Sequence, residues 1–427
     1  MNEERRDEDS DPVLGADRFE ADTHGSSAEA GRGVTGLGGF VVLFMTAAAA
    51  LGTSTIYVLQ PAVGDVAASI GTAVPDIGIA LAWGPIGYMI GLAVIVPLVD
   101  RCLPRLVLCL QFAVLASGLM LSSLVVSASQ LALLVAVTGA CSVVGAGMTT
   151  LVGRLAEPLR RATTLGVVTA GISVGILAGR VVGGSLAEAL GWDVMLRCFA
   201  VACAVFGLGC LMLIPKAPRT APMTGYLATL RSVPGLFVRH PALRIAAIRG
   251  ASWFFAFCAV WSGLAVTLVQ PPYAATSEQV GLYALAGLSG LVATPIAGRR
   301  TDRVGARRVV LTGLVLALAA VIPLGFVLPG MAATMICLAV FDAGLFAAQV
   351  ANQSTVLDID PAAPARFNSG YMLAYFIGGS LGTAFGAAGI GWFGWTLTTV
   401  LSGVMVVLAI AVTLLWRGAR PAPELRS

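Results

Sequence analysis

The chain has 427 residues, of which 57% are hydrophobic and 11% are charged. A soluble domain averages about half apolar and about a quarter charged residues, so this composition excludes an ordinary water-soluble fold. We predict an all-α membrane protein. The net charge of +4 reflects Lys and Arg residues that lie mostly in loops and tails, where they set the orientation of a membrane protein. It therefore does not indicate a nucleic-acid partner.

Twelve apolar windows are long enough to cross a bilayer core about 30 Å thick. The predicted spans are 37–59, 75–99, 106–127, 131–152, 164–187, 194–214, 245–269, 280–297, 309–328, 332–356, 369–390 and 395–416. When both termini are placed in the cytoplasm, none of the outer loops between these spans contains Lys or Arg. This bias predicts cytoplasmic termini and a multi-pass protein of a bacterial inner (plasma) membrane.

The spans divide into two predicted six-helix halves, residues 37–214 and 245–416. A cytoplasmic linker, 215–244, joins them, and a disordered acidic tail, 1–36, and a short cytoplasmic tail, 417–427, flank them. Gly191 and Gly394, each followed by Trp, lie 203 residues apart, whereas a GGSL tetrapeptide recurs at an offset of only 195. Repeated halves predict pseudo-two-fold symmetry, with the substrate path between them.

Two motifs give the chain a resemblance to the major facilitator superfamily (MFS). The loop after the eighth span resembles its G-x-x-x-D-R-x-G-x-R-R signature through Gly298, Asp302, Arg303, Gly305, Arg307 and Arg308, and a degraded first-half copy keeps Asp100, Arg101 and Arg105. The fifth span is similar to the glycine signature of MFS antiporters through Gly175, Gly179, Gly183 and Gly184, with Arg180 in place of its proline. This variant and further pieces resemble a bacterial drug and small-molecule efflux branch.

The resemblance implies a twelve-helix fold that works by alternating access. It implies a cytoplasmic latch at the loop signatures, with Asp100 and Asp302 at the N-terminal ends of the third and ninth spans, where helix dipoles favour negative charge. The other interpretations are topological anchoring for the latch residues and plain helix packing for the glycines.

Two ionisable side chains lie deep in the predicted spans. Asp342 is about 15 Å and Arg180 about 10 Å from the outer ends of their spans, at about 1.5 Å per residue. Charges in hydrocarbon are costly, so such groups are functional candidates. We hypothesise that Asp342 and Arg180 pair across the two halves in one state, and that protonation of Asp342 removes the attraction. A static hydrogen bond of Asp342 is the alternative.

Polar and aromatic residues of the spans that border the cavity in the superfamily are candidates for substrate contacts. The polar ones are Thr53, Tyr57 and Gln60 near the first span, and Gln349, Asn352 and Gln353 in the tenth. In the seventh span, Trp253, Phe257 and Trp261 share one helix face because they are four residues apart. Such a stripe lines a cavity, or it faces lipid or a neighbouring helix.

The leading functional prediction is proton-coupled antiport of small organic molecules or drugs out of the cell. Proton-symport uptake of a polar metabolite is the first alternative, and a non-transporting receptor or scaffold is the second. We predict no enzyme, because the chain has two His, no nucleotide-binding motif and no metal-ligand pattern. No cofactor or metal is expected beyond the proton gradient. The expected partners are the lipid bilayer, protons and a small-molecule substrate, and the chain is expected to be a monomer.

Overall fold

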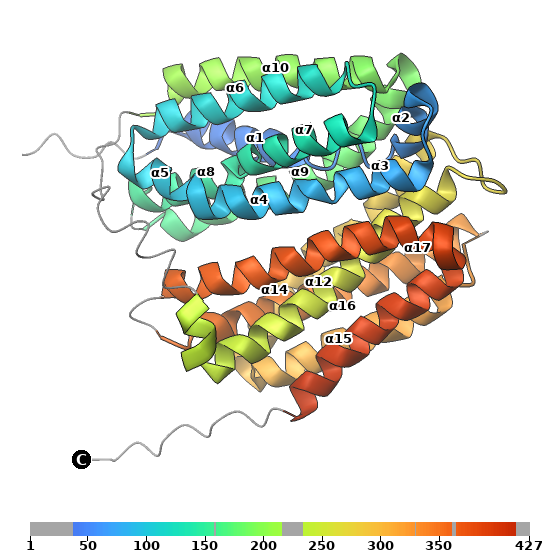
Figure 1. The fold of residues 1–427 in the computed structure, drawn as a ribbon. Coiled ribbons are helices and arrows are strands. Elements are labelled where there is room, and N and C mark those ends of the chain that lie inside the picture. Colours follow the sequence, from blue (N-terminus) through green and yellow to red (C-terminus); the bar gives the residue numbers. More distant parts are fainter. Residues whose placement is uncertain (1–36, 158, 216–233, 329, 361–363, 416–427) are drawn as a thin grey trace, which may run out of the picture.

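The computed structural model describes residues 37–157, 159–215, 234–328, 330–360 and 364–415. The predicted N-terminal and C-terminal tails and most of the linker lie outside these residues. The first half contains α1 (Gly39–Ser54), α2 (Val63–Ile70), α3 (Val74–Leu81), α4 (Trp83–Val94), α5 (Val96–Arg101), α6 (Pro104–Ser122), α7 (Ala128–Cys141), α8 (Val144–Leu155), α9 (Arg161–Leu190) and α10 (Trp192–Leu213). The second contains α12 (Pro241–Leu268), α13 (Ser277–Leu282), the 3-10 helix η1 (Tyr283–Gly287), α14 (Leu288–Val304), α15 (Ala306–Leu324), α16 (Met331–Leu357) and α17 (Pro364–Leu415). The predicted all-α membrane fold is confirmed (Figure 1).

Ten helical segments of the described chain are long and apolar enough to span a bilayer. The first predicted span is the shorter α1, which ends at Ser54, and the last two are merged in α17. The chain turns back inside α17 at Gly394, whose φ of 73° is a left-handed value that glycine adopts without strain. The second, fourth and eighth spans consist of consecutive shorter helices. The short helix α2 lies between the first two predicted spans and was not predicted.

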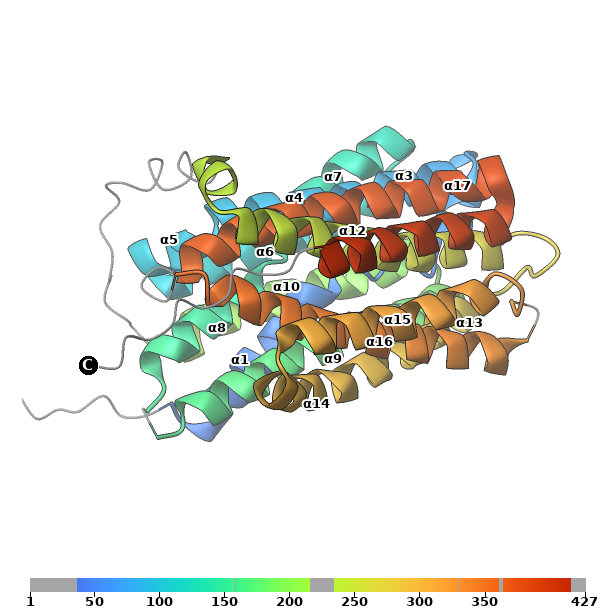
Figure 2. The same cartoon turned by 90° about the horizontal axis from the view of Figure 1, so that it is seen from below.

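The halves are built on a repeated helix pair with very close backbones. In the first half, Gly175 and Gly183 of α9 approach the backbone of Ala50 and Val58 in the first span so closely that a Cβ atom would collide with it. In the second half, glycines of α17 approach α12 in the same way at Gly378, Gly382 and Gly386. Figure 2 shows α12 running alongside α17. Small residues allow this distance, which favours van der Waals packing in lipid.

These equivalent contacts define the internal repeat at residue level. Gly175 and Gly378 have the same role 203 residues apart, which agrees with the offset between Gly191 and Gly394. In this register Gly183 corresponds to Gly386, which contacts α12 as Gly183 contacts the first span. The recurring GGSL tetrapeptide, which would match Gly183 with Gly378, is therefore a chance repetition.

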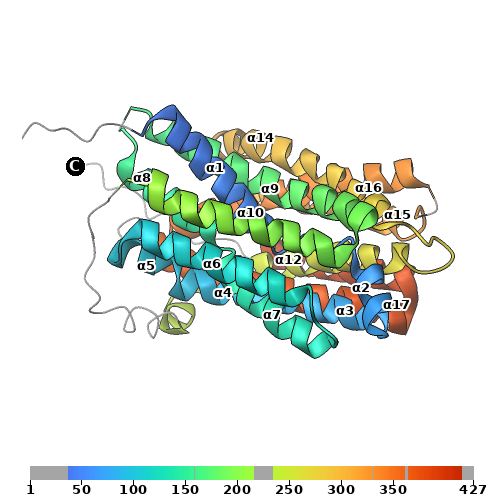
Figure 3. The ribbon, with the colours of Figure 1, turned by 90° about the horizontal axis from the view of Figure 1, so that it is seen from above.

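The two halves touch at the end of the bundle away from the linker; we call this the closed end. There Gly184 of α9 lies against Ser277 and Gly281 of α13, and Gly78 of α3 lies against Ala387 of α17. The Ser277 hydroxyl also donates a hydrogen bond to Asp65 of α2 at 2.6 Å. Viewed from above, α2, α3 and the turn of α17 gather at this end, opposite α5 and α8 (Figure 3). The opposite end, where α10 ends and α12 begins, is called the linker end.

Candidate functional site

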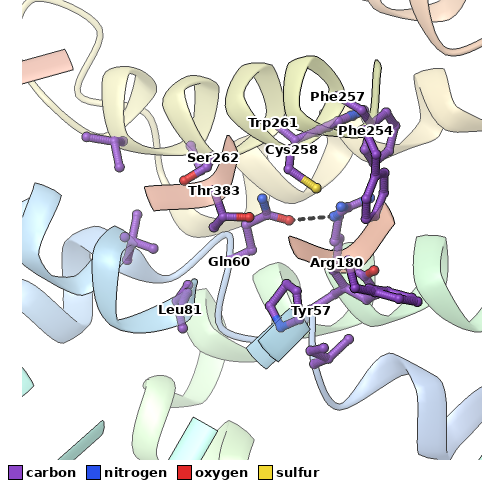
Figure 4. Close-up of a pocket in the computed structure, with 17 residues that line it drawn as sticks. Tyr57, Gln60, Leu81, Arg180, Phe254, Phe257, Cys258, Trp261, Ser262 and Thr383 are labelled. Atoms are coloured by element: carbon purple, nitrogen blue, oxygen red, sulfur yellow. Dashed lines mark hydrogen bonds between the residues drawn. The ribbon is translucent and has the colours of Figure 1, made fainter. Parts of the chain in front are cut away.

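A cavity with about 650 Å³ of empty space lies between the halves (Figure 4). Both halves contribute to its wall, in which rings and aliphatic side chains predominate. The lining residues are Ile56, Tyr57, Gln60, Val63, Gly78, Leu81, Pro85, Arg180, Phe254, Phe257, Cys258, Trp261, Ser262, Ala265, Val266, Phe376 and Thr383. A concave, mostly apolar space with few polar groups is typical of a small-molecule site.

Local chain geometry brings two polar side chains into this wall. Because α1 ends at Ser54, the following residues run through turns, in which the amide of Tyr57 donates to Ser54 and that of Gln60 donates to Tyr57. Pro61 lacks an amide hydrogen and follows directly. Tyr57 and Gln60 thus lie beside the cavity on non-helical backbone, which is tolerated at membrane depth where it lines a cavity.

Arg180 is the charged side chain of the cavity wall, and it is only 4% exposed. Its Nε donates to Oε1 of Gln60 at 2.7 Å, as Figure 4 shows. Its Cζ lies 4.7 Å from the ring centroid of Tyr57 and 4.8 Å from that of Trp261. Two aromatic faces at these distances stabilise a cation electrostatically where water is scarce.

Asp342 of α16 is 1% exposed and lies behind the cavity wall. The indole Nε1 of Trp261 donates to its Oδ1 at 3.2 Å. Asp342 and Arg180, both in the described part of the chain, form no ion pair in this conformation. Instead, Trp261 contacts Arg180 through its ring and Asp342 through its N–H. The direct pair of another state stays a prediction.

The structure separates the other predicted substrate contacts into two groups. Tyr57, Gln60 and Phe257 line the cavity. The remaining five do not: Thr53 faces α8 near Gly145, Trp253 packs against Phe254 and Tyr375, and Gln349, Asn352 and Gln353 face α17. Those three amides thus belong to helix packing in this conformation, because each side chain has a hydrogen-bond partner on a neighbouring helix.

Tyr371 is the centre of this amide cluster and is fully buried. Its hydroxyl donates to Oε1 of Gln349 at 2.6 Å and accepts from Nδ2 of Asn352 at 3.2 Å. We expect Tyr371→Phe to lower the free energy of unfolding by about 1–3 kcal/mol, because buried polar atoms lose their partner. Thermal unfolding in lipid nanodiscs measures this. A variant as stable as the parent protein would contradict this assignment.

The predicted glycine signature lies where α9 meets the first span and α13. Gly175, Gly179 and Gly183 face the first span, and Gly184 faces α13 at the closed end. Within this conformation, three of the four glycines pack helices of the same half together. The fourth lies at a contact between the halves.

The predicted latch residues lie at the linker end. Asp302 is in the last turn of α14, and Asp100 is in α5 with a side chain outside the described atoms. The prediction that these two acids lie at the N-terminal ends of the third and ninth spans is thus wrong. Each acid lies in the last turn of the preceding helix. Arg307 donates to the carbonyls of Thr413 and Leu414 in the last turn of α17, where the helix dipole favours a cation. The other predicted latch residues are Gly298 and Arg303 in α14, Gly305 between α14 and α15, Arg308 in α15, Arg101 in α5 and Arg105 in α6.

Trp261, which was predicted as part of the aromatic stripe of the seventh span, lines the cavity. Several other lining residues were given no role from the sequence. Phe254, one turn before Phe257, could have been found from its spacing to that stripe. Phe376 and Thr383 of α17 carried no such signal, because lone aromatic and hydroxyl residues are common in spans.

Comparisons of the sequence with known proteins agree with this architecture. The family described as Major Facilitator Superfamily matches residues 42–276 and 253–427. The chain is 36% identical over 291 residues to a probable transporter of Streptomyces coelicolor. The matched region covers 67% of this chain and 65% of that relative, so the chain spans less than two thirds of the relative's length. It is 28% identical to the Escherichia coli transporter YgaY, over 88% of this chain and 95% of YgaY.

Two solved structures have a similar fold. One is a bacterial homologue of the human lysosomal transporter Spinster in an inward-facing, unoccupied conformation, with a TM-score of 0.74 and 15% identity over 88% of this chain and 96% of the homologue. The other is the nucleoside transporter NupG, with a TM-score of 0.71 and 14% identity over 89% of this chain and 100% of NupG. At these identities the likeness establishes the fold alone.

Proposed function

Because the chain belongs to the major facilitator superfamily, and is thus a multi-pass membrane transporter and not an enzyme, we propose that it exports small organic molecules by proton-coupled antiport. We place it in a bacterial inner membrane with both termini in the cytoplasm, so that the linker end faces the cytoplasm. One observation carries the proposal: Trp261 lies in the cavity wall and links Arg180 of the first half to Asp342 of the second.

The cavity suits cargo with a large apolar surface. Phe254, Phe257, Trp261 and Phe376 present rings to it, while Gln60 and Arg180 supply polar groups on the opposite half. A ligand with a flat apolar body can be desolvated against these rings and oriented by a few polar contacts.

The proposed coupling acts through the position of Trp261. While Asp342 is ionised, its carboxylate accepts a charge-assisted hydrogen bond that holds the indole in the wall. A proton on Asp342 weakens this bond, and the ring is then free to turn into the space that cargo occupies. Binding of the proton and binding of cargo thereby exclude each other. Whichever of the two is bound shifts the equilibrium between the conformations of the transport cycle.

The sign of the pH effect on cargo binding tests antiport. Expression in an efflux-deficient bacterium with a panel of toxic compounds identifies an exported compound, and its binding to purified protein in nanodiscs is then measured from pH 8 to pH 5. Antiport requires the affinity to fall as the pH falls, because protons and cargo compete. An affinity that rises on acidification would indicate symport and contradict the proposal.

Trp261→Phe tests the link itself. Phenylalanine keeps an aromatic face for Arg180 but has no N–H for Asp342. We expect this variant to bind the exported compound with a much smaller pH dependence than the parent protein. Trp253→Phe, on the same helix but outside the cavity wall, is the matched control and should keep the full pH dependence. An unchanged pH dependence in Trp261→Phe would rule out coupling through the indole.

A further inference from the structure

The buried charges of the described helices do not balance. Arg180, Arg249 and Asp342 are the charged residues that are more than nine-tenths buried there, which makes two cations and one carboxylate. Arg249 has a weak hydrogen bond of 3.5 Å to Thr355, and its buried Nε has no partner among the described residues. An uncompensated charge in a low-dielectric interior is costly. The protein interior therefore favours an additional negative charge.

The guanidinium of Arg180 is placed to receive that charge. Its Nε donates to Gln60, and its Cζ lies over the rings of Tyr57 and Trp261. Its two Nη groups donate to no protein atom in the described chain. They are also not fully buried, in contrast to the unpartnered Nε of Arg249. Arg180 lines the large cavity and also a second space of about 230 Å³ beside it. The fork of donors thus borders open space.

We propose that the cargo is a flat organic anion whose carboxylate, or an equivalent two-oxygen anionic group, binds the Nη groups of Arg180. Planar guanidinium groups bind carboxylates through two parallel hydrogen bonds, which gives both affinity and orientation. The apolar body of the anion then lies against Phe257 and the neighbouring rings of the second half. This inference rests on the proposed transport function for its cavity and extends it to a substrate class.

Three probes of one shape and different charge test the proposal. They are 2-naphthoate, 2-naphthamide and 2-naphthylmethylammonium, titrated by calorimetry into the full chain in nanodiscs at pH 7.5. We expect the carboxylate to bind at least about tenfold more tightly than the amide, as a charge-assisted bidentate pair should, and the ammonium to bind most weakly. Equal affinities, undetectable binding of all three, or a preference for the amide or the ammonium would overturn the proposal.

Variants of Arg180 locate the preference. Arg180→Gln should remove the difference between carboxylate and amide, and Arg180→Lys should retain part of it, because lysine keeps the charge but not the fork. Arg197→Gln, in α10 and outside the cavity, is the matched control and should keep the full preference. A preference that survives in a folded Arg180→Gln protein would place the anion elsewhere and refute the assignment.

These outcomes are separable from those of the proposed function. A carboxylate preference that depends on Arg180 stands even if a pH gradient drives no export, in which case antiport is wrong and the cargo class is right. Export driven by a pH gradient without any charge preference among the probes leaves antiport intact and refutes the anionic cargo.

Discussion

Asp342→Asn is expected to abolish export driven by a pH gradient, while cargo still exchanges down its own concentration gradient. Asparagine is nearly isosteric, and its carbonyl still accepts the hydrogen bond of Trp261, so the wall of the cavity is retained. It cannot take up or release a proton, so the state of the side chain no longer depends on pH. Uptake of an exported compound into inside-out vesicles, with and without an imposed pH gradient, measures both quantities.

The control for this variant is Glu188→Gln in the same assay. Glu188 lies exposed near the closed end of α9, and its neutralisation should leave gradient-driven transport unchanged. Counterflow in Asp342→Asn vesicles shows that the protein is folded and cycles. Gradient-driven accumulation at the parent level in this variant would eliminate Asp342 as the coupling group.

Gly175→Leu is expected to prevent assembly of the first half. A Cβ atom at this position would overlap the backbone carbonyl of Ala50 in α1, and backbone cannot move aside as the end of a side chain can. Overpacking of a tight interface costs about 1–3 kcal/mol in typical cases, and here two helix backbones must separate. We expect loss of monodisperse protein in detergent, measured by fluorescence-detected size-exclusion chromatography of a fusion protein.

The same helix offers a matched control. Gly166→Leu replaces a glycine of α9 that has open space around its Cα, so this protein should fold and transport normally. Gly382→Leu in α17, which meets the backbone of Phe255, should fail as Gly175→Leu does. A well-folded Gly175→Leu protein would mean that α1 and α9 do not approach each other as the structure has them.

The internal repeat illustrates what local sequence can and cannot determine. Composition and apolar length were enough to predict the twelve spans, since a bilayer requires helices of a given length with internally satisfied backbones. The offset of 203 residues between Gly191 and Gly394 agrees with the register of the repeat in the structure. The GGSL match failed because a single tetrapeptide identity among many Gly and Leu residues carries little information about which helix faces meet.

Residues of the candidate site show the limit of sequence reasoning more sharply. The depth of Asp342 and Arg180 followed from counting residues along a helix, which requires no tertiary information. Whether Gln349 faces the cavity depends on the rotation of α16 about its axis, and whether Gln60 does depends on the turns that follow α1. Tertiary packing sets both, and here it turns Gln349 towards Tyr371 and holds Gln60 beside Arg180.

The amino-acid order was therefore sufficient for the membrane, the two halves, the glycine-rich helix and the two deep charges. These are properties of single helices and of their solvent, and each can be worked out from local spacing and burial cost. Trp261 received its position between Asp342 and Arg180 from contacts among α9, α12 and α16, which lie far apart in the chain. A link of this kind joins atoms from both halves, and so it arises only when the halves pack together.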